Sequence, residues 1–66
     1  MRLNLDEKAD ALYLRLDESP IVETAEVSPG MMLDYNAQKQ VVGVEILNVS
    51  KRTPALNPRA FQFQTA

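Results

Sequence analysis

The sequence contains neither cysteine nor histidine among its 66 residues. Without cysteine there are no disulfides and no thiol chemistry, and without either residue no ordinary nucleophilic dyad can form around a serine or threonine. The commonest zinc ligand is also missing. Only two glycines occur, Gly30 and Gly43, so there is no glycine-rich loop to hold a phosphate. These absences favour a protein that is not an enzyme, and we expect no cofactor and no metal.

Charge and hydrophobicity argue against two further classes of partner. Seven basic and nine acidic residues give a net charge of −2, whereas a nucleic-acid-binding surface normally needs a concentrated basic stripe. No apolar run approaches the roughly 20 residues of a membrane-spanning helix, and the N-terminal residues lack the hydrophobic region of a signal peptide. We therefore expect a cytoplasmic protein that binds neither nucleic acid nor membrane.

The length leaves room for one domain with a marginal core. A chain of roughly 60 residues buries only about 60% of the surface that its unfolded form exposes. Domains this small usually gain stability from disulfides, a metal or a partner subunit. Since the usual ligands and cross-links are absent, self-association is the remaining ordinary remedy. We expect a homodimer or a higher homo-oligomer.

The strongest local pattern is a β-hairpin between Met31 and Val49. Residues 41–49 are rich in β-branched side chains, which a pleated, half-buried surface favours. Residues 31–36 alternate in the manner of a strand. If residues 37–40 form a four-residue loop, Asn36 faces Val41, and one face of the hairpin becomes the predicted core. That face carries Met31, Leu33, Tyr35, Val42, Val44 and Ile46.

The other side of the hairpin, called the mixed face here, carries Met32, Asp34, Val41, Gly43, Glu45 and Leu47. Apolar side chains beside two carboxylates need partial cover, from the C-terminal segment or from a second copy of the chain. A glycine in mid-strand commonly marks a bulge or a close approach, and at Gly43 we expect the Tyr13 ring or a partner's side chain. The predicted interaction surface consists of Met32, Val41, Gly43, Leu47 and Phe61.

Asp34 and Glu45 are the candidate catalytic or metal-binding residues, because the register places them diagonally adjacent on one face. Two such carboxylates can hold Mg²⁺ or Ca²⁺, or divide acid and base roles between them. A hard cation needs more than two oxygen ligands, and no others are evident. The competing interpretation is a pair exposed at an edge or hydrogen-bonded at a dimer interface.

The rest of the chain completes a small sheet. Residues 1–5 and 11–16 alternate as strands, with a helix over residues 6–16 as the competing interpretation. Residues 21–27 are expected to form an edge strand guarded by Glu23 and Glu26, or an ordered loop, before a turn at Ser28-Pro29-Gly30. The predicted fold is therefore a small α+β domain over residues 1–53, with an antiparallel sheet of four to five short strands.

Residues 54–66 are predicted to form a C-terminal helix or an extended tail that packs on the sheet or on a partner. Asn57 followed by Pro58 is a plausible start for a helix of about two turns. Phe61 would then cover the mixed face.

Four short motifs follow one another along the chain: EKADALYL at 7–14, VSPG at 27–30, LDY at 33–35 and VGVEIL at 42–47. Their order resembles the family called domain of unknown function 2283, over residues 3–52. Its members are small, mostly bacterial or archaeal proteins without an established activity. The resemblance implies a compact sheet-based fold and carries over no catalytic residue. Similar genes often lie beside small toxin-like ones, which implies an antitoxin-like role with a small protein partner.

One position departs from that family's pattern. Its hairpin loop usually carries a glycine where this sequence has Lys39. If the position needs a positive φ, Lys39 is strained by about 1 kcal/mol.

Taken as a whole, the sequence predicts a non-enzymatic protein-interaction module that self-associates and has an antitoxin-like role. The alternative is a metal-dependent or carboxylate-based enzyme that uses Asp34 and Glu45.

Overall fold

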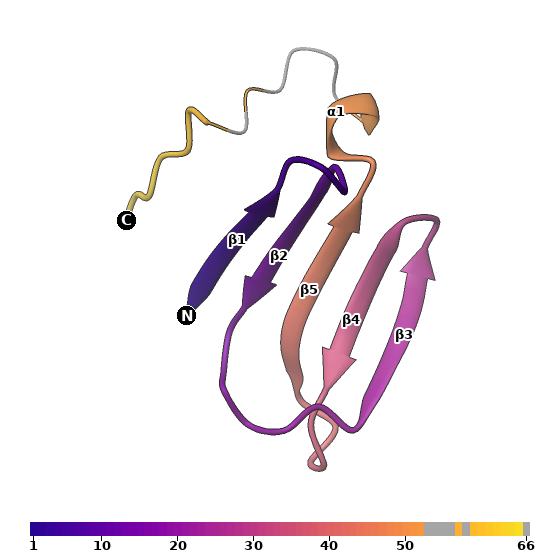
Figure 1. The fold of residues 1–66 in the computed structure, drawn as a ribbon. Helices are drawn as coiled ribbons and strands as arrows, with labels where there is room; N and C mark the ends of the chain where they lie inside the picture. The colour runs from indigo at the N-terminus through magenta and orange to yellow at the C-terminus, as the bar shows by residue number, and fades with distance from the viewer. Residues whose placement is uncertain (53–56, 58, 66) are drawn as a thin grey trace.

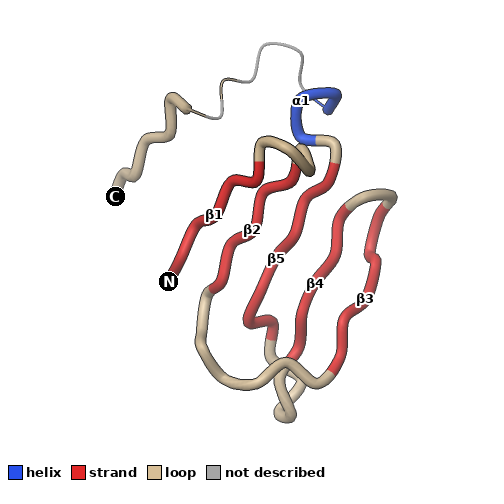
Figure 2. Tube along the Cα trace, viewed as in Figure 1, coloured by secondary structure: helices blue, strands red, loops and turns tan. Residues whose placement is uncertain are grey.

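The computed structural model describes residues 1–52, 57 and 59–65, and they form one antiparallel sheet (Figure 1 and Figure 2). The strands are β1 (Arg2–Asp6), β2 (Ala11–Arg15), β3 (Glu23–Ser28), β4 (Met31–Tyr35) and β5 (Val41–Leu47). A four-residue helix, α1 (Val49–Arg52), lies at one end of the sheet. The predicted fold class, a small antiparallel sheet with a short helical element after it, is confirmed.

The strand order is β1-β2-β5-β4-β3, so an N-terminal hairpin lies beside a three-strand meander. Residues 16–22 cross the end of the sheet from β2 to β3 (Figure 1). The Leu16 N–H donates to the Val42 carbonyl oxygen at 2.8 Å and so extends the β2–β5 ladder. The Arg15 guanidinium donates to the carbonyl oxygens of Asp17 and Ser19. These bonds hold the crossing segment against the sheet.

The predicted strands are confirmed, with small shifts at their ends. The competing helix over residues 6–16 is wrong, because Leu12 and Leu14 lie in a strand paired on both sides. The segment expected at residues 21–27 forms the edge strand β3. The last strand ends at Leu47 rather than Val49, since Asn48 has a φ of 55° and turns the chain into α1.

The β4–β5 hairpin keeps the predicted register from the Met31–Ile46 pair to the Asp34–Gly43 pair. The expected pairing of Asn36 with Val41 is wrong. A β-bulge after Asp34 shifts the register, so Val41 pairs with Tyr35 instead. The bulge adds one residue to β5 and moves Val41 off the mixed face.

The loop between β4 and β5 is organised by Asn36, whose side chain is only 5% exposed. Its Oδ1 accepts hydrogen bonds from the N–H groups of Gln38 and Gln40, each at 3.0 Å. Its own N–H donates to the Gln40 carbonyl oxygen, and the Lys39 N–H donates to the Asn36 carbonyl oxygen, again at 3.0 Å. The loop therefore closes over residues 37–39 and not over the four residues expected.

Lys39 occupies the left-handed region, with a φ of 63°, as the departure from the family pattern suggested. A three-residue hairpin loop commonly places its last residue in this conformation, and glycine is the residue that suits it. The other non-glycine residues with positive φ in the described chain are Asp10 and Asn48. Those two types tolerate the left-handed region better than lysine does. Lys39 is therefore the strained position.

Lys39→Gly should stabilise the protein by up to about 0.5 kcal/mol, because the relief of about 1 kcal/mol of strain exceeds the entropy that a glycine adds to the unfolded chain. Urea denaturation at fixed protein concentration measures the change. Gln38→Gly in the same loop is the matched control, since its φ is not positive, and it should lower stability. Equal effects of the two substitutions would contradict strain at Lys39.

Residues 54–66 were predicted to form a helix or an extended tail, and the described residues 57 and 59–65 do not form the helix. Residues 57 and 59–65 contain a turn, in which the Ala60 N–H donates to the Asn57 carbonyl oxygen at 3.0 Å. Asn57 Oδ1 accepts a hydrogen bond from the Arg59 N–H at 3.1 Å, so its side chain caps this turn. Pro58, on which the expected helix also depended, lies outside the described residues.

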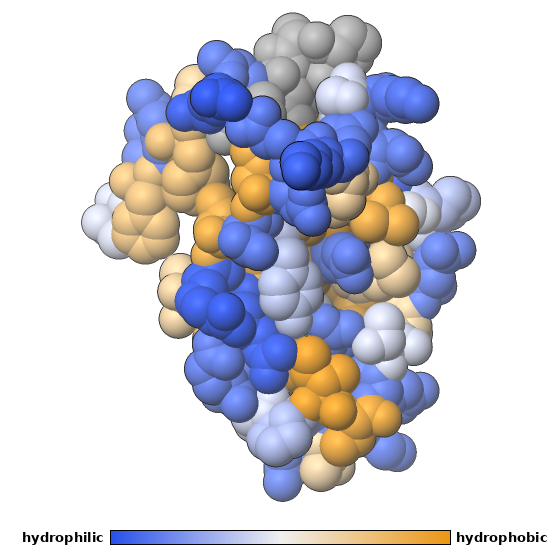
Figure 3. Space-filling model, viewed as in Figure 1, coloured by the Kyte–Doolittle hydropathy of each residue, from blue (hydrophilic) through white to orange (hydrophobic). Residues whose placement is uncertain are grey.

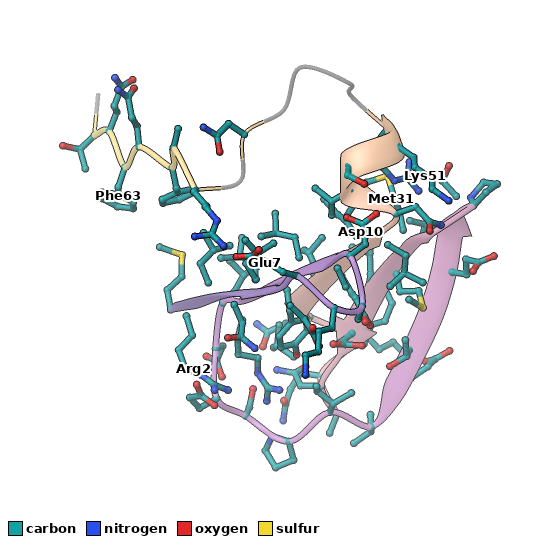
Figure 4. All side chains as sticks on the ribbon, turned by 45° about the horizontal axis from the view of Figure 1, so that its top comes forward. Arg2, Glu7, Asp10, Met31, Lys51 and Phe63 are labelled. Atoms are coloured by element: carbon teal, nitrogen blue, oxygen red, sulfur yellow. The ribbon has the colours of Figure 1, made fainter. Side chains whose placement is uncertain are left out.

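Asp10 connects the β1–β2 turn to α1 (Figure 4). Its carboxylate accepts hydrogen bonds from the Ser50 N–H at 3.0 Å and the Ser50 hydroxyl at 2.7 Å, although the two residues are 40 positions apart. Its carbonyl oxygen accepts the Val49 N–H at 3.1 Å. These bonds satisfy donors at the start of α1 that have no partner within the helix. Asp10 therefore fixes the helix to the first turn of the sheet.

The Ser50 hydroxyl, the Ser50 N–H and the charge of Lys51, in that order, hold the pKa of the Asp10 carboxyl below its usual range. A carboxyl whose pKa is lower in the folded state stabilises that state above its unfolded pKa, and the contribution disappears as the pH falls through the folded value.

Asp10→Asn should therefore lower stability at pH 7, and its deficit against the parent protein should shrink as the pH falls from about 5 to about 2. Urea midpoints over this pH range give the comparison. Glu23→Gln on the exposed edge strand is the control, because it removes one carboxylate far from α1. A deficit that does not change with pH would show that the Asp10 charge is not responsible.

Candidate functional site

One side of the sheet is almost entirely apolar across its strands. Residues that pair directly on neighbouring antiparallel strands point to the same side. The register therefore gathers the following side chains into what is called the leucine face here: Leu3, Leu5, Leu12, Leu14, Leu33, Val44, Ile46 and Met31. Four residues of the predicted core, Met31, Leu33, Val44 and Ile46, belong to this face. Of the six residues predicted as core, Val42 is buried and the other five are half-buried.

The leucine face has little cover in the described chain. The hydrophobic side chains that are well buried are Ala11, Val42 and Val49, at 8%, 2% and 4% exposure. Leu3 is 38% exposed, and the other members of the face are half-buried. The described elements form a single layer, with α1 at the end of the sheet and not across it (Figure 2). A face with core composition is thus left partly open to solvent.

The described residues of the tail, 57 and 59–65, cover one corner of this face. Phe61 borders shallow hollows that it shares with side chains of β1, β2 and β5: Leu3, Leu5, Leu12, Leu14, Val44 and Ile46. The Arg59 guanidinium forms a 2.8 Å ion pair with Glu7, which ties the tail to the β1–β2 turn. Phe61 remains 62% exposed and Phe63 70% exposed, and Figure 4 shows Phe63 beyond the edge of the sheet.

The opposite side of the sheet carries a hydrogen-bonded polar network. The Tyr13 hydroxyl donates to Asp34 Oδ2 at 3.0 Å, and the Thr24 hydroxyl donates to Asp34 Oδ1 at 2.6 Å. Arg15 Nη1 donates to the Tyr13 oxygen at 3.3 Å. Figure 3 views the sheet from this side and shows a mostly hydrophilic surface. The network spans the sheet from β2 to β3.

Gly43 makes this network possible. It lies on β5, between the strands that carry Tyr13 and Asp34. A Cβ atom at Gly43 would lie 2.7 Å from both Asp34 Oδ2 and the Tyr13 hydroxyl oxygen, which is too close for a real side chain. The prediction that the glycine admits Tyr13 is confirmed.

The structure separates the five residues predicted as an interaction surface. Met32, Gly43 and Leu47 keep a common side of the sheet by their register. Val41 leaves them because of the bulge, and Phe61 lies against the leucine face instead of the mixed face. The five residues therefore do not form one surface. Phe61 is separated from the others because the tail lies near β1 and β2 and packs on the leucine face.

Asp34 and Glu45 share one side of the sheet, as the register predicted. Asp34 is 7% exposed and each of its carboxylate oxygens accepts a hydrogen bond from the protein. In residues 1–52, 57 and 59–65 no group of three or more acidic residues is placed to hold a metal ion. The roles of Arg15 and Thr24 in the network were not predicted. Arg15 reaches it only because β2 pairs with β5, which is distant in the chain, and Thr24, on the strand consecutive with β4, carried no sequence signal of its own.

Comparison with known proteins gives one match. The family model described as "Protein of unknown function (DUF2283)" matches residues 2–50, which include all five strands and the start of α1. No curated protein and no solved structure matches the chain. Among the described residues, no helix has the length and apolar character required to span a membrane.

Gly43→Ala should destabilise the protein by about 1–3 kcal/mol, because the added methyl group collides with the Tyr13–Asp34 hydrogen bond. The same substitution in a Tyr13→Phe background should cost at least about 0.5 kcal/mol less, since one of the two colliding oxygens is gone. Urea denaturation of the four proteins in this double-mutant cycle measures the coupling. Strictly additive effects would contradict the collision.

Proposed function

The chain belongs to the DUF2283 family of proteins of unknown function, and we propose that it is a non-enzymatic protein-interaction module that self-associates. The observation that carries this proposal is the leucine face, a sheet surface with the composition of a core and no layer over it in the described chain. Exposed apolar patches on soluble proteins commonly mark interaction sites. The absence of cysteine from the sequence supports a cytoplasmic location.

A carboxylate-based activity at Asp34 and Glu45 makes a different demand on the structure. Acid–base or metal chemistry needs at least one carboxylate that can reach its ligand. Asp34 is nearly buried and is held by Tyr13 and Thr24, which supports a structural role for it. This alternative also has its own test: Mg²⁺ or Ca²⁺ would raise the melting temperature of the parent protein but not that of an Asp34→Asn, Glu45→Gln variant.

An antitoxin-like role is the narrower form of the proposal. It adds that the assembled protein binds one small protein in a fixed ratio. The polar side of the sheet supports such a role, because its charged and apolar side chains, among them Arg15, Glu45, Met32 and Leu47, are partly exposed there. A tagged full-length chain purified from its source cells should then retain one small partner, identified by mass spectrometry.

Self-association predicts a mass of at least twice the 7.4 kDa chain in sedimentation equilibrium at pH 7. The melting temperature should also rise over about a hundredfold increase in protein concentration, because folding and assembly are linked. A single 7.4 kDa species with a melting temperature independent of concentration would contradict the proposal. Lys39→Gly serves as a control, since it changes stability without touching either side of the sheet.

A further inference from the structure

We propose that the leucine face is the surface of self-association and that it binds the same face of a second copy of the chain, so that two sheets pack into a sandwich. The inference rests on the proposed function and adds to it how the two copies pack, with the leucine face of one sheet against the leucine face of the other. Two sheets packed face to face lie about 10 Å apart, with the inner side chains of both filling the space between them.

The exposed surface of the chain is larger than that of a compact monomer of the same mass. The chain exposes 5179 Å², whereas a compact monomer of 7.4 kDa exposes about 4,200 Å². The tail, whose described residues are all exposed, and the open sheet both contribute to this excess.

The shape of the chain leads to the same conclusion. Its radius of gyration is 12.8 Å, whereas a compact domain of this length has one of about 10.8 Å. The single-layer sheet and the tail, whose described residues lie outside the sheet, both enlarge the radius of gyration. The segments of residues 1–52 outside the strands form turns, the crossing segment and α1 and no second layer, so a second chain is the natural source of one.

The distribution of charge favours an identical partner. The strand positions on the leucine face carry no charge in β1, β2, β4 or β5, whereas Arg2, Arg15, Asp34 and Glu45 point to the other side. On β3, at the edge of the sheet, Glu23 lies on the leucine side because it pairs with Tyr35. Two copies, each with a net charge of −2, can therefore meet over β1, β2, β5 and β4 without placing like charges in contact. A charged partner would find no complementary group here. An isologous contact needs only a self-complementary apolar surface.

Two other surfaces suit self-association less well. The outer edge of the sheet at β3 carries Glu23 and Glu26 and contains a bulge between Glu26 and Ser28, features that discourage pairing with another strand. The polar side of the sheet already satisfies its central groups within the Tyr13–Asp34 network.

Single cysteines can test the assignment cleanly, because the natural chain has none. Leu14→Cys places a thiol on the leucine face and Met32→Cys places one on the polar side, at two half-buried strand positions. Cysteine is a small hydrophobic residue, so both variants should fold, which far-ultraviolet circular dichroism checks. Sedimentation equilibrium establishes that each is assembled before its rate of reaction with a thiol reagent is measured.

In the assembled protein Leu14→Cys should react at least about tenfold more slowly than Met32→Cys, each relative to its own rate in denaturant. If the protein is assembled and Leu14→Cys reacts as fast as Met32→Cys, this inference is overturned. The proposed function still stands in that case, because assembly through a strand edge or through the polar side would give the same result. A chain that is monomeric at every concentration overturns the proposed function and this inference with it.

Discussion

The pairing of β2 with β5 joins the N-terminal hairpin to the C-terminal meander, and side chains fasten it at both ends. At one end Asp10 binds Ser50 at the start of α1. At the other end Arg15 holds the crossing segment while the Leu16 N–H extends the ladder to Val42. An isolated two-stranded hairpin is only marginally stable, so β1 and β2 depend on this pairing for their place in the sheet. The Tyr13–Asp34 hydrogen bond exists only because β2 and β4 flank the same strand.

Once these strands are in register, the two sides of the sheet acquire opposite characters. Polar groups on the Gly43 side form hydrogen bonds with one another. The buried Asp34 carboxylate therefore has its partners within the chain. The side chains of the leucine face cannot be satisfied by hydrogen bonds within the sheet, because apolar side chains lose contact with water only when another surface covers them. In residues 1–52 the segments outside the five strands form turns, the crossing segment and the four-residue helix, and none of them builds a second layer. The open face is thus a direct result of how the short sequence is divided.

Local pattern was sufficient to predict the strands and most of the β4–β5 register, because alternation and β-branched runs are properties of neighbouring residues. The prediction failed where a contact depends on distant residues. The bond from Asp10 to Ser50 and the position of Phe61 on the leucine face both require the sheet order to be known. The bulge that moves Val41 was also missed, although it lies within one hairpin, because the alternation of apolar residues does not indicate it. The Gly43–Tyr13 contact was predictable because a mid-strand glycine signals a close approach, but Thr24 gave no comparable signal. For the candidate carboxylates, the register was correct and the hydrogen bonds that hold Asp34 were not foreseen.

The crossing segment of residues 16–22 also has a consequence for the order in which the sheet forms. The β1–β2, β3–β4 and β4–β5 pairings each join strands that are consecutive in the chain, whereas the β2–β5 pairing must bring together strands separated by two others. Closing so long a loop costs entropy before any contact rewards it, so non-local pairing tends to limit the rate of folding. The two local units should therefore appear first, and their joining should be the slow step. Arg15 orders the crossing segment, which is part of the loop that must close before β2 can pair with β5.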